Sequence, residues 1–161
     1  MRGRILGRIR MGTVVPTLLA VGLGAGWLAR EAAFARTRAE MVKSATINVD
    51  ALKMADHLYQ GEVTGKAGVY ISGDTPGSTK FVTGRFILAP GKTPHAPHVH
   101  PEEEVMVIES GHGEIVCDGK TTKVGPGSVM YTTPNAPHGI NNTGSEPIVF
   151  YWVKWESKGK Q

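Results

Sequence analysis

Three histidines and one glutamate have the types and spacing of metal ligands. His98, His100 and Glu104 are separated by even steps, and His138 follows in a later segment. On an extended strand alternate side chains share a face, so His98, His100 and Glu104 are expected on one side of a sheet. Imidazoles and a carboxylate form a mixed nitrogen and oxygen set that suits a first-row divalent ion. The sequence therefore predicts a metal site with His98, His100, Glu104 and His138 as ligands.

The segment that carries the first three ligands resembles the first signature motif of the cupin superfamily. It starts at Gly91, continues through His98-Val-His100 to Glu104, and ends at Gly111. Gly91 stands one residue further from His98 than the motif has it, which changes the preceding loop and leaves the ligands in place.

The segment around His138 resembles the second cupin motif. It runs from Gly127 through Pro134 and His138 to Asn142, with the proline one place late. Asn135 takes the place of the usual turn glycine, and asparagine tolerates a positive φ better than other residues with a side chain. Asn142 is expected to hold a turn or a strand end by hydrogen bonds.

The resemblance implies an all-β fold, a double-stranded β-helix or jelly-roll barrel, with a divalent transition metal near the open end of a central cavity. Fe, Mn, Ni, Co and Zn are all compatible with the ligand set. Met106 and Ile108 continue the parity of Glu104, which makes them candidates for the apolar wall of the pocket, with plain core packing as the alternative for Ile108. His95 is a candidate catalytic base at the cavity mouth. A metal-free pocket that uses the same groups for hydrogen bonding is the alternative.

Strand and turn patterns independently predict a β domain. Runs of β-branched and aromatic residues alternate with Gly, Pro, Asn and Asp, and Asp118-Gly119 is a strong two-residue hairpin turn. This spacing leaves no room for crossover helices and indicates an antiparallel sandwich or barrel. The predicted strands are Gly68–Ser72, Phe81–Leu88, Val105–Glu109, Glu114–Cys117, Val129–Thr132 and Ile148–Trp155.

Residues 1–35 have the composition of a signal peptide. An arginine-rich start precedes an apolar run from Thr13 to Leu28 and the small-residue pattern Ala33-Phe34-Ala35 of a signal-peptidase site. An uncleaved membrane anchor is the alternative, because the run is near the lower limit for a span. The expected location is the periplasm or the exterior, with membrane contact only through an uncleaved leader.

The remainder of the chain is expected to divide into two parts. Residues 36–62 are interpreted as an N-terminal arm or short helix, and apolar positions in Asp50–Tyr59 suggest a helical turn. Residues 63–161 form the predicted cupin β-barrel domain. The apolar strand Ile148–Trp155 is a candidate contact for a homodimer.

The net positive charge of the chain comes from the leader. It holds five of the 18 basic residues and one of the 14 acidic ones, so 13 of each remain in residues 36–161. This balance gives no reason to expect a nucleic-acid partner. Cys117 is the only cysteine, which excludes an intramolecular disulfide.

The expected partner is a small-molecule ligand or substrate, and three classes of function follow. The first is a dioxygenase-like oxidoreductase that acts on a small oxygenated organic compound, because four protein ligands leave open positions on a five- or six-coordinate metal. The second is a metal-dependent isomerase or lyase, and the third is a non-catalytic protein that binds a small ligand or the metal. The sequence has no catalytic triad, phosphate loop or nucleotide fingerprint, which disfavours triad hydrolysis and ATP chemistry.

Overall fold

A computed structural model describes residues 41–159 of the chain. The predicted leader, residues 1–35, lies outside this range, and so do the first residues of the predicted arm. No helix among the described residues is long and apolar enough to cross a membrane. The described residues form an all-β domain, as predicted.

The strands follow one another along the chain with short turns between most of them. A 3-10 helix, η1, spans Val49–Ala51. The strands are β1 (Ala55–Tyr59), β2 (Glu62–Gly73), β3 (Ser78–Leu88), β4 (Glu103–Ser110), β5 (Gly113–Cys117), β6 (Lys120–Val124), β7 (Val129–Thr132), β8 (His138–Asn141) and β9 (Ile148–Ser157).

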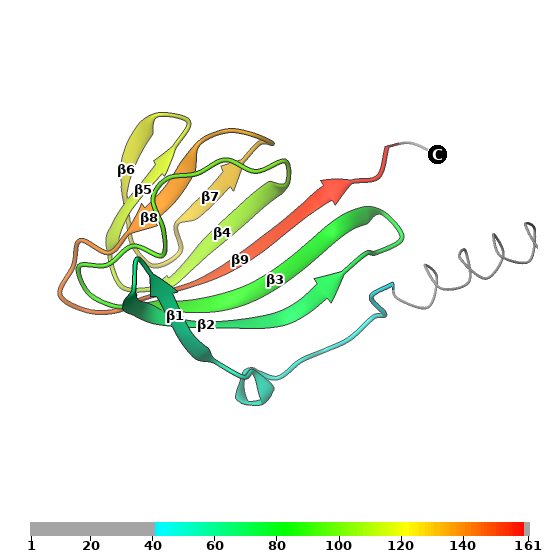
Figure 1. Ribbon diagram of the computed structural model, residues 1–161, viewed down its shortest axis with the longest axis horizontal. Helices are drawn as coiled ribbons and strands as arrows, with labels where there is room; N and C mark the ends of the chain where they lie inside the picture. Colours follow the sequence, from blue (N-terminus) through cyan, green and yellow to red (C-terminus); the bar gives the residue numbers. More distant parts are fainter. Residues whose placement is uncertain (1–40, 160–161) are drawn as a thin grey trace, which may run out of the picture. The chain divides into compact units, whose positions relative to one another are not determined.

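Two antiparallel sheets make up the domain (Figure 1). The larger sheet has the order β1-β2-β3-β9-β4-β7, and the smaller has the order β6-β5-β8. Strand β9 returns from the end of the chain to lie between β3 and β4, which gives the jelly-roll connectivity. Both edges of β9 are hydrogen-bonded, so a dimer contact through Ile148–Trp155 would have to use its outer face.

The hydrophobic core lies between the inner faces of the two sheets. Phe86, Met106 and Phe150 come from the larger sheet, and Ile115 and Ile140 from the smaller one. Along β3, β4, β5 and β9 these side chains alternate with more exposed residues, as expected for a sheet with one face on the core. The same alternation decides which side chains of β4, β8 and β9 face the space between the sheets.

The six strands predicted from the sequence are all present, and most are longer than predicted. The hairpin at Asp118-Gly119 is confirmed, with φ values of 48° and 75°. Strands β1, β6 and β8 were not predicted. Residues 55–59 pair with β2 rather than form a helical turn, so the larger sheet begins before residue 63.

Candidate metal centre

Backbone hydrogen bonds hold two of the predicted ligands together. His98 and His138 exchange both possible backbone bonds, each 3.0 Å from nitrogen to oxygen, as an isolated antiparallel bridge. His138 begins β8, whereas His98 and His100 lie in the loop before β4, which starts at Glu103. The expectation that His98, His100 and Glu104 share one strand is therefore wrong, because Pro101 has no N–H to donate to a continuing ladder.

The three histidines converge on one point. One nitrogen from each of His98, His100 and His138 lies within 4.8 Å of the others. The ring of His98 is 5.2 Å from that of His100 and 4.7 Å from that of His138, and the rings of His100 and His138 are 4.7 Å apart. These three residues are therefore positioned to hold a metal ion.

Two of the imidazoles have their orientation fixed by backbone carbonyls. His100 donates from Nδ1 to the carbonyl of Glu102 at 3.1 Å, and His138 donates from Nδ1 to the carbonyl of Ala136 at 2.9 Å. In a neutral ring the other nitrogen, Nε2, then carries a lone pair. This is the usual way in which a ligand histidine is oriented toward a metal.

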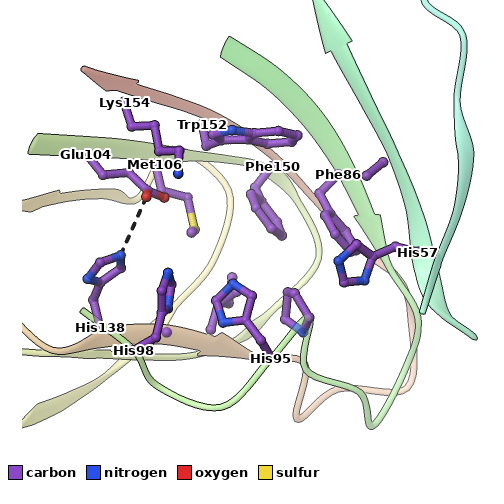
Figure 2. A pocket seen from close by; sticks show the side chains of 14 residues that line it. His57, Phe86, His95, His98, Glu104, Met106, His138, Phe150, Trp152 and Lys154 are labelled. Carbon is purple, nitrogen blue, oxygen red and sulfur yellow. Dashed lines mark ion pairs between the residues drawn. The ribbon is translucent and has the colours of Figure 1, made fainter. Parts of the chain in front are cut away.

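Glu104 places its carboxylate against the Nε2 atoms of His100 and His138. Its Oε2 lies 2.9 Å from His100 Nε2 and 3.5 Å from His138 Nε2, the second contact being drawn as a dashed line in Figure 2. Burial acts to raise the pKa of Glu104, but the imidazoles of His138 and His100 outweigh it and bring the pKa below its ordinary value. A carboxylate and the lone pairs of neutral imidazoles repel unless a proton or a metal ion lies between them.

The remaining electrostatics agree with a site for a cation. Burial, together with neighbouring histidines, lowers the pKa of His98 to about 4, so its ring is neutral and in the form that binds a metal. The Glu104 carboxylate raises the pKa of His138. His98 Nδ1 and His138 Nε2 are buried without a hydrogen-bond partner. Such an atom costs about 1–3 kcal/mol, which coordination to a metal would offset. The residues present therefore fit a divalent ion.

His98, His138 and Glu104 line one end of a cavity of about 180 Å³ between the two sheets (Figure 2). Phe86, Met106, Phe150 and Trp152 form its apolar wall. Phe86 and Phe150 stack with parallel rings 5.3 Å apart. Met106 thus lines the pocket as expected, whereas Ile108 lies deeper, in the hydrophobic core, where it is 1 % exposed. Ile108 lies two residues further along β4 than Met106, where core side chains fill the space between the sheets.

Three further polar side chains line the cavity. His95 packs its ring edge-on against His98, with centroids 4.1 Å apart, and bonds from Nδ1 to the carbonyl of Ala96. Sequence reasoning gave no role to His57 of β1 or Lys154 of β9, and both line the cavity. Lys154 shares the parity of Phe150 and Trp152, and that alternation could have identified it.

Asn142 closes the turn after β8 and contributes no ligand. Its buried amide donates to the carbonyls of Leu88 and Glu146, and its Oδ1 accepts from the N–H of Gly144. The expected turn role of Asn142 is thereby confirmed. Asn135, at the place of the motif's turn glycine, has a φ of 62°, as its residue type allows.

Comparison with known proteins agrees with this architecture. Residues 84–154 match the family model described as "Cupin domain". A Cupin 2 conserved barrel domain protein from Salinispora arenicola is 23% identical, with a TM-score of 0.51, over 71% of this chain and 89% of that one. KdgF from Halomonas sp. is 14% identical, with a TM-score of 0.57, over 73% and 97%. A putative sugar phosphate isomerase from Acidithiobacillus ferrooxidans is 17% identical, with a TM-score of 0.54, over 69% and 74%. At these identities the solved structures establish the fold alone.

Proposed function

The chain belongs to the cupin superfamily, and on that premise we propose that it is an exported metal-dependent oxidoreductase of the dioxygenase type. Its substrate would be a small oxygenated organic compound. His98, His100 and His138 would hold the metal, with Glu104 as a fourth ligand. The proposal rests on residues that gather at one end of a cavity with an apolar wall.

One observation carries the metal part of this proposal. His100 donates a hydrogen bond from Nδ1 to the backbone carbonyl of Glu102, and its Nε2 lies 2.9 Å from the Glu104 carboxylate. Two acceptor atoms at that distance need either a proton or a metal ion between them, and the converging histidines favour the metal ion. The carboxylate also faces His138, so a single ion could satisfy all of these atoms. A divalent transition metal would supply Lewis acidity and, if redox-active, electron transfer to dioxygen.

The position of the ligands favours chemistry over a purely structural metal. A structural zinc site is normally closed by its four protein ligands, whereas a catalytic metal keeps a position open to substrate. Here His98, Glu104 and His138 face the cavity, and Phe150 and Trp152 form part of its apolar wall. A substrate bound in that space would meet the metal on its open side.

The test uses the full chain loaded anaerobically with iron(II). Nitric oxide should give the electron paramagnetic resonance signal of an iron nitrosyl in the wild type and in His112→Ala, whose exposed histidine lies outside the cavity. The signal should be lost in His138→Ala. Iron that binds to the wild type but gives no nitric oxide signal would contradict an open redox site.

A metal-dependent isomerase or lyase is the second candidate, and His57 is the observation that favours it. Thr64 Oγ1 donates to the carbonyl of His57, so it accepts from His57 Nδ1 at 3.0 Å. This leaves Nε2 as a proton acceptor. Burial, assisted by His95, lowers the pKa of His57 and keeps the ring neutral near pH 7. A neutral imidazole on the wall of a substrate cavity suits a general base.

Oxygen dependence separates the two candidates. Once a turned-over compound is known, an oxidoreductase of this type should consume dioxygen in proportion to product, and His57→Gln should retain part of its activity. An isomerase should turn over equally well under argon and should lose activity in His57→Gln. Ligand binding without turnover, either in air or under argon, would indicate a non-catalytic binding protein.

Export is proposed from the leader alone. If signal peptidase reads Ala33-Phe34-Ala35, the mature chain begins at Arg36. Intact-mass measurement of protein from the native host should give the mass of residues 36–161 in a soluble fraction. A membrane-associated chain that retains Met1 would establish the anchor instead.

A further inference from the structure

Lys154 carries a positive charge that has no partner among the described residues of the metal cluster or of the surrounding sheet. It lies on the inner side of β9, next to Glu104 in the register of β4 and β9, and it lines the cavity. In Figure 2 its ammonium group points toward the space beside Met106 and Glu104. Among the residues that the structure describes, this ammonium has no ion pair and no hydrogen bond.

The neighbouring carboxylate does not account for this position. Glu104 directs Oε2 at His100 and His138 and forms no ion pair with Lys154 in the described domain. Lys154 is still close enough to act on the cluster, since its charge works to lower the pKa of His138. Lys154 as a residue is half-buried, and its ammonium group is left available to a ligand in the cavity.

The rest of the cavity indicates what would accompany the charge. Along β9 the inward side chains are Phe150, Trp152 and Lys154, so the ammonium stands at one end of an aromatic surface. Trp152 lies over Gly84 of β3, where a Cβ atom would come within 2.3 Å of the indole ring. The backbone thus makes room for a flat apolar surface next to a single positive charge.

We propose that Lys154 is the anchor for the carboxylate of a small organic acid whose apolar body packs on Phe86, Phe150 and Trp152. This names the substrate class and in that respect rests on the proposed function. The anionic end would lie beside the histidine cluster. A divalent ion held by three neutral imidazoles and one carboxylate has a net positive charge, which together with Lys154 favours an anion at this end of the cavity.

The test compares benzoate with benzamide, which has nearly the same shape and no charge. Binding to the full chain is measured by isothermal titration calorimetry, in zinc-loaded and in metal-free protein. The wild type should bind benzoate at least about tenfold more tightly than benzamide, as expected for a desolvated hydrogen-bonded ion pair. In metal-free protein Lys154→Met should abolish this preference and leave benzamide binding unchanged, whereas in zinc-loaded protein it should only weaken the preference, because the metal ion also attracts the carboxylate.

Two control variants separate charge from structure. Lys154→Arg should keep the preference for benzoate, and so should Lys120→Gln, which removes an exposed lysine of β6. Thermal unfolding and zinc content are measured for every variant, so that a folding defect or a loss of metal is recognised. An equal preference in Lys154→Met and the wild type would overturn the proposal, as would equal affinities of the wild type for the two probes.

The outcomes also separate this proposal from the function on which it rests. A preference for benzoate that depends on Lys154 in metal-free protein would support the anchor even if the chain bound no redox metal. A nitrosyl signal in protein that does not discriminate benzoate from benzamide would support the oxidoreductase and overturn the anchor.

Discussion

The cavity has two walls that are built in different ways. We call His98, Glu104 and His138, together with the adjacent His100, the ligand wall, and Phe86, Phe150 and Trp152 the aromatic wall. The ligand wall is largely positioned by local backbone contacts, such as the bridge between His98 and His138. The aromatic wall belongs to the central strands of the larger sheet, and two of its members are part of the hydrophobic core. Changes in the first wall should therefore alter metal binding, and changes in the second should alter stability.

The largest effect on stability is expected from the aromatic wall. Phe150 is 3 % exposed and stacks on Phe86. Phe150→Ala should lower the free energy of unfolding by about 3–5 kcal/mol, because it removes buried apolar surface and leaves a cavity. Chemical denaturation measures this loss, and the folded fraction should still bind metal. A loss below about 1 kcal/mol would place Phe150 outside the core.

Glu104→Gln tests the ligand wall with a side chain of the same shape. It removes the charge next to His100 and His138, so metal affinity should fall about 100-fold. The free energy of unfolding of the metal-free protein should change less than in Phe150→Ala. Competition with a chelator measures the metal affinity. An unchanged affinity would mean that Glu104 is not a ligand and that only the three histidines hold the metal.

Gly84→Ala tests the packing of Trp152, a member of the aromatic wall, against β3. The added methyl group would come within 2.3 Å of the Trp152 ring and 2.6 Å of the Gly68 carbonyl oxygen. Pushing the indole into the cavity should cost about 1–3 kcal/mol of stability, and benzamide should then bind less tightly. Gly77→Ala is the matched control, since nothing lies within 4 Å of a Cβ at that position. Equal effects of the two substitutions would mean that Trp152 does not depend on Gly84.

The smallest effect concerns pH in metal-free protein. His98 has a pKa near 4 in the fold, below its ordinary 6.5. Between these values the unfolded chain binds a proton that the folded chain does not, so this histidine's contribution to stability is lost as pH falls from 6.5 toward 4. His98→Asn should reduce that pH dependence. Denaturation at several pH values measures it, and a slope unchanged by the substitution would contradict the low pKa.

The two walls also differ in how far the sequence reveals them. The ligand spacing and the two motifs identify His98, His100 and His138, because residue type and interval specify this chemistry directly. Lys154 and His57 have no such motif, and only the tertiary fold brings them to the cavity. Lys154 sits in an apolar strand where its parity with Trp152 is the single clue.

Two of the unpredicted strands, β6 and β8, have sequences with little strand pattern of their own. Strand β6 reads Lys-Thr-Thr-Lys-Val and is almost wholly exposed, so no buried face marks it. Strand β8 is only His-Gly-Ile-Asn, in which glycine and asparagine disfavour a strand. Both form through pairing with β5, a contact between segments that the local sequence does not encode. The long strands β3 and β9 carry a strong enough pattern to be predicted.

Metal stoichiometry tests the central claim most directly. Elemental analysis of the protein from its native compartment, set beside His138→Ala and His112→Ala, counts each transition metal per folded chain. The account predicts about one ion per chain in the wild type and in His112→Ala, and almost none in His138→Ala, with all three proteins folded. A wild type without metal, or a full complement of metal in His138→Ala, would contradict it.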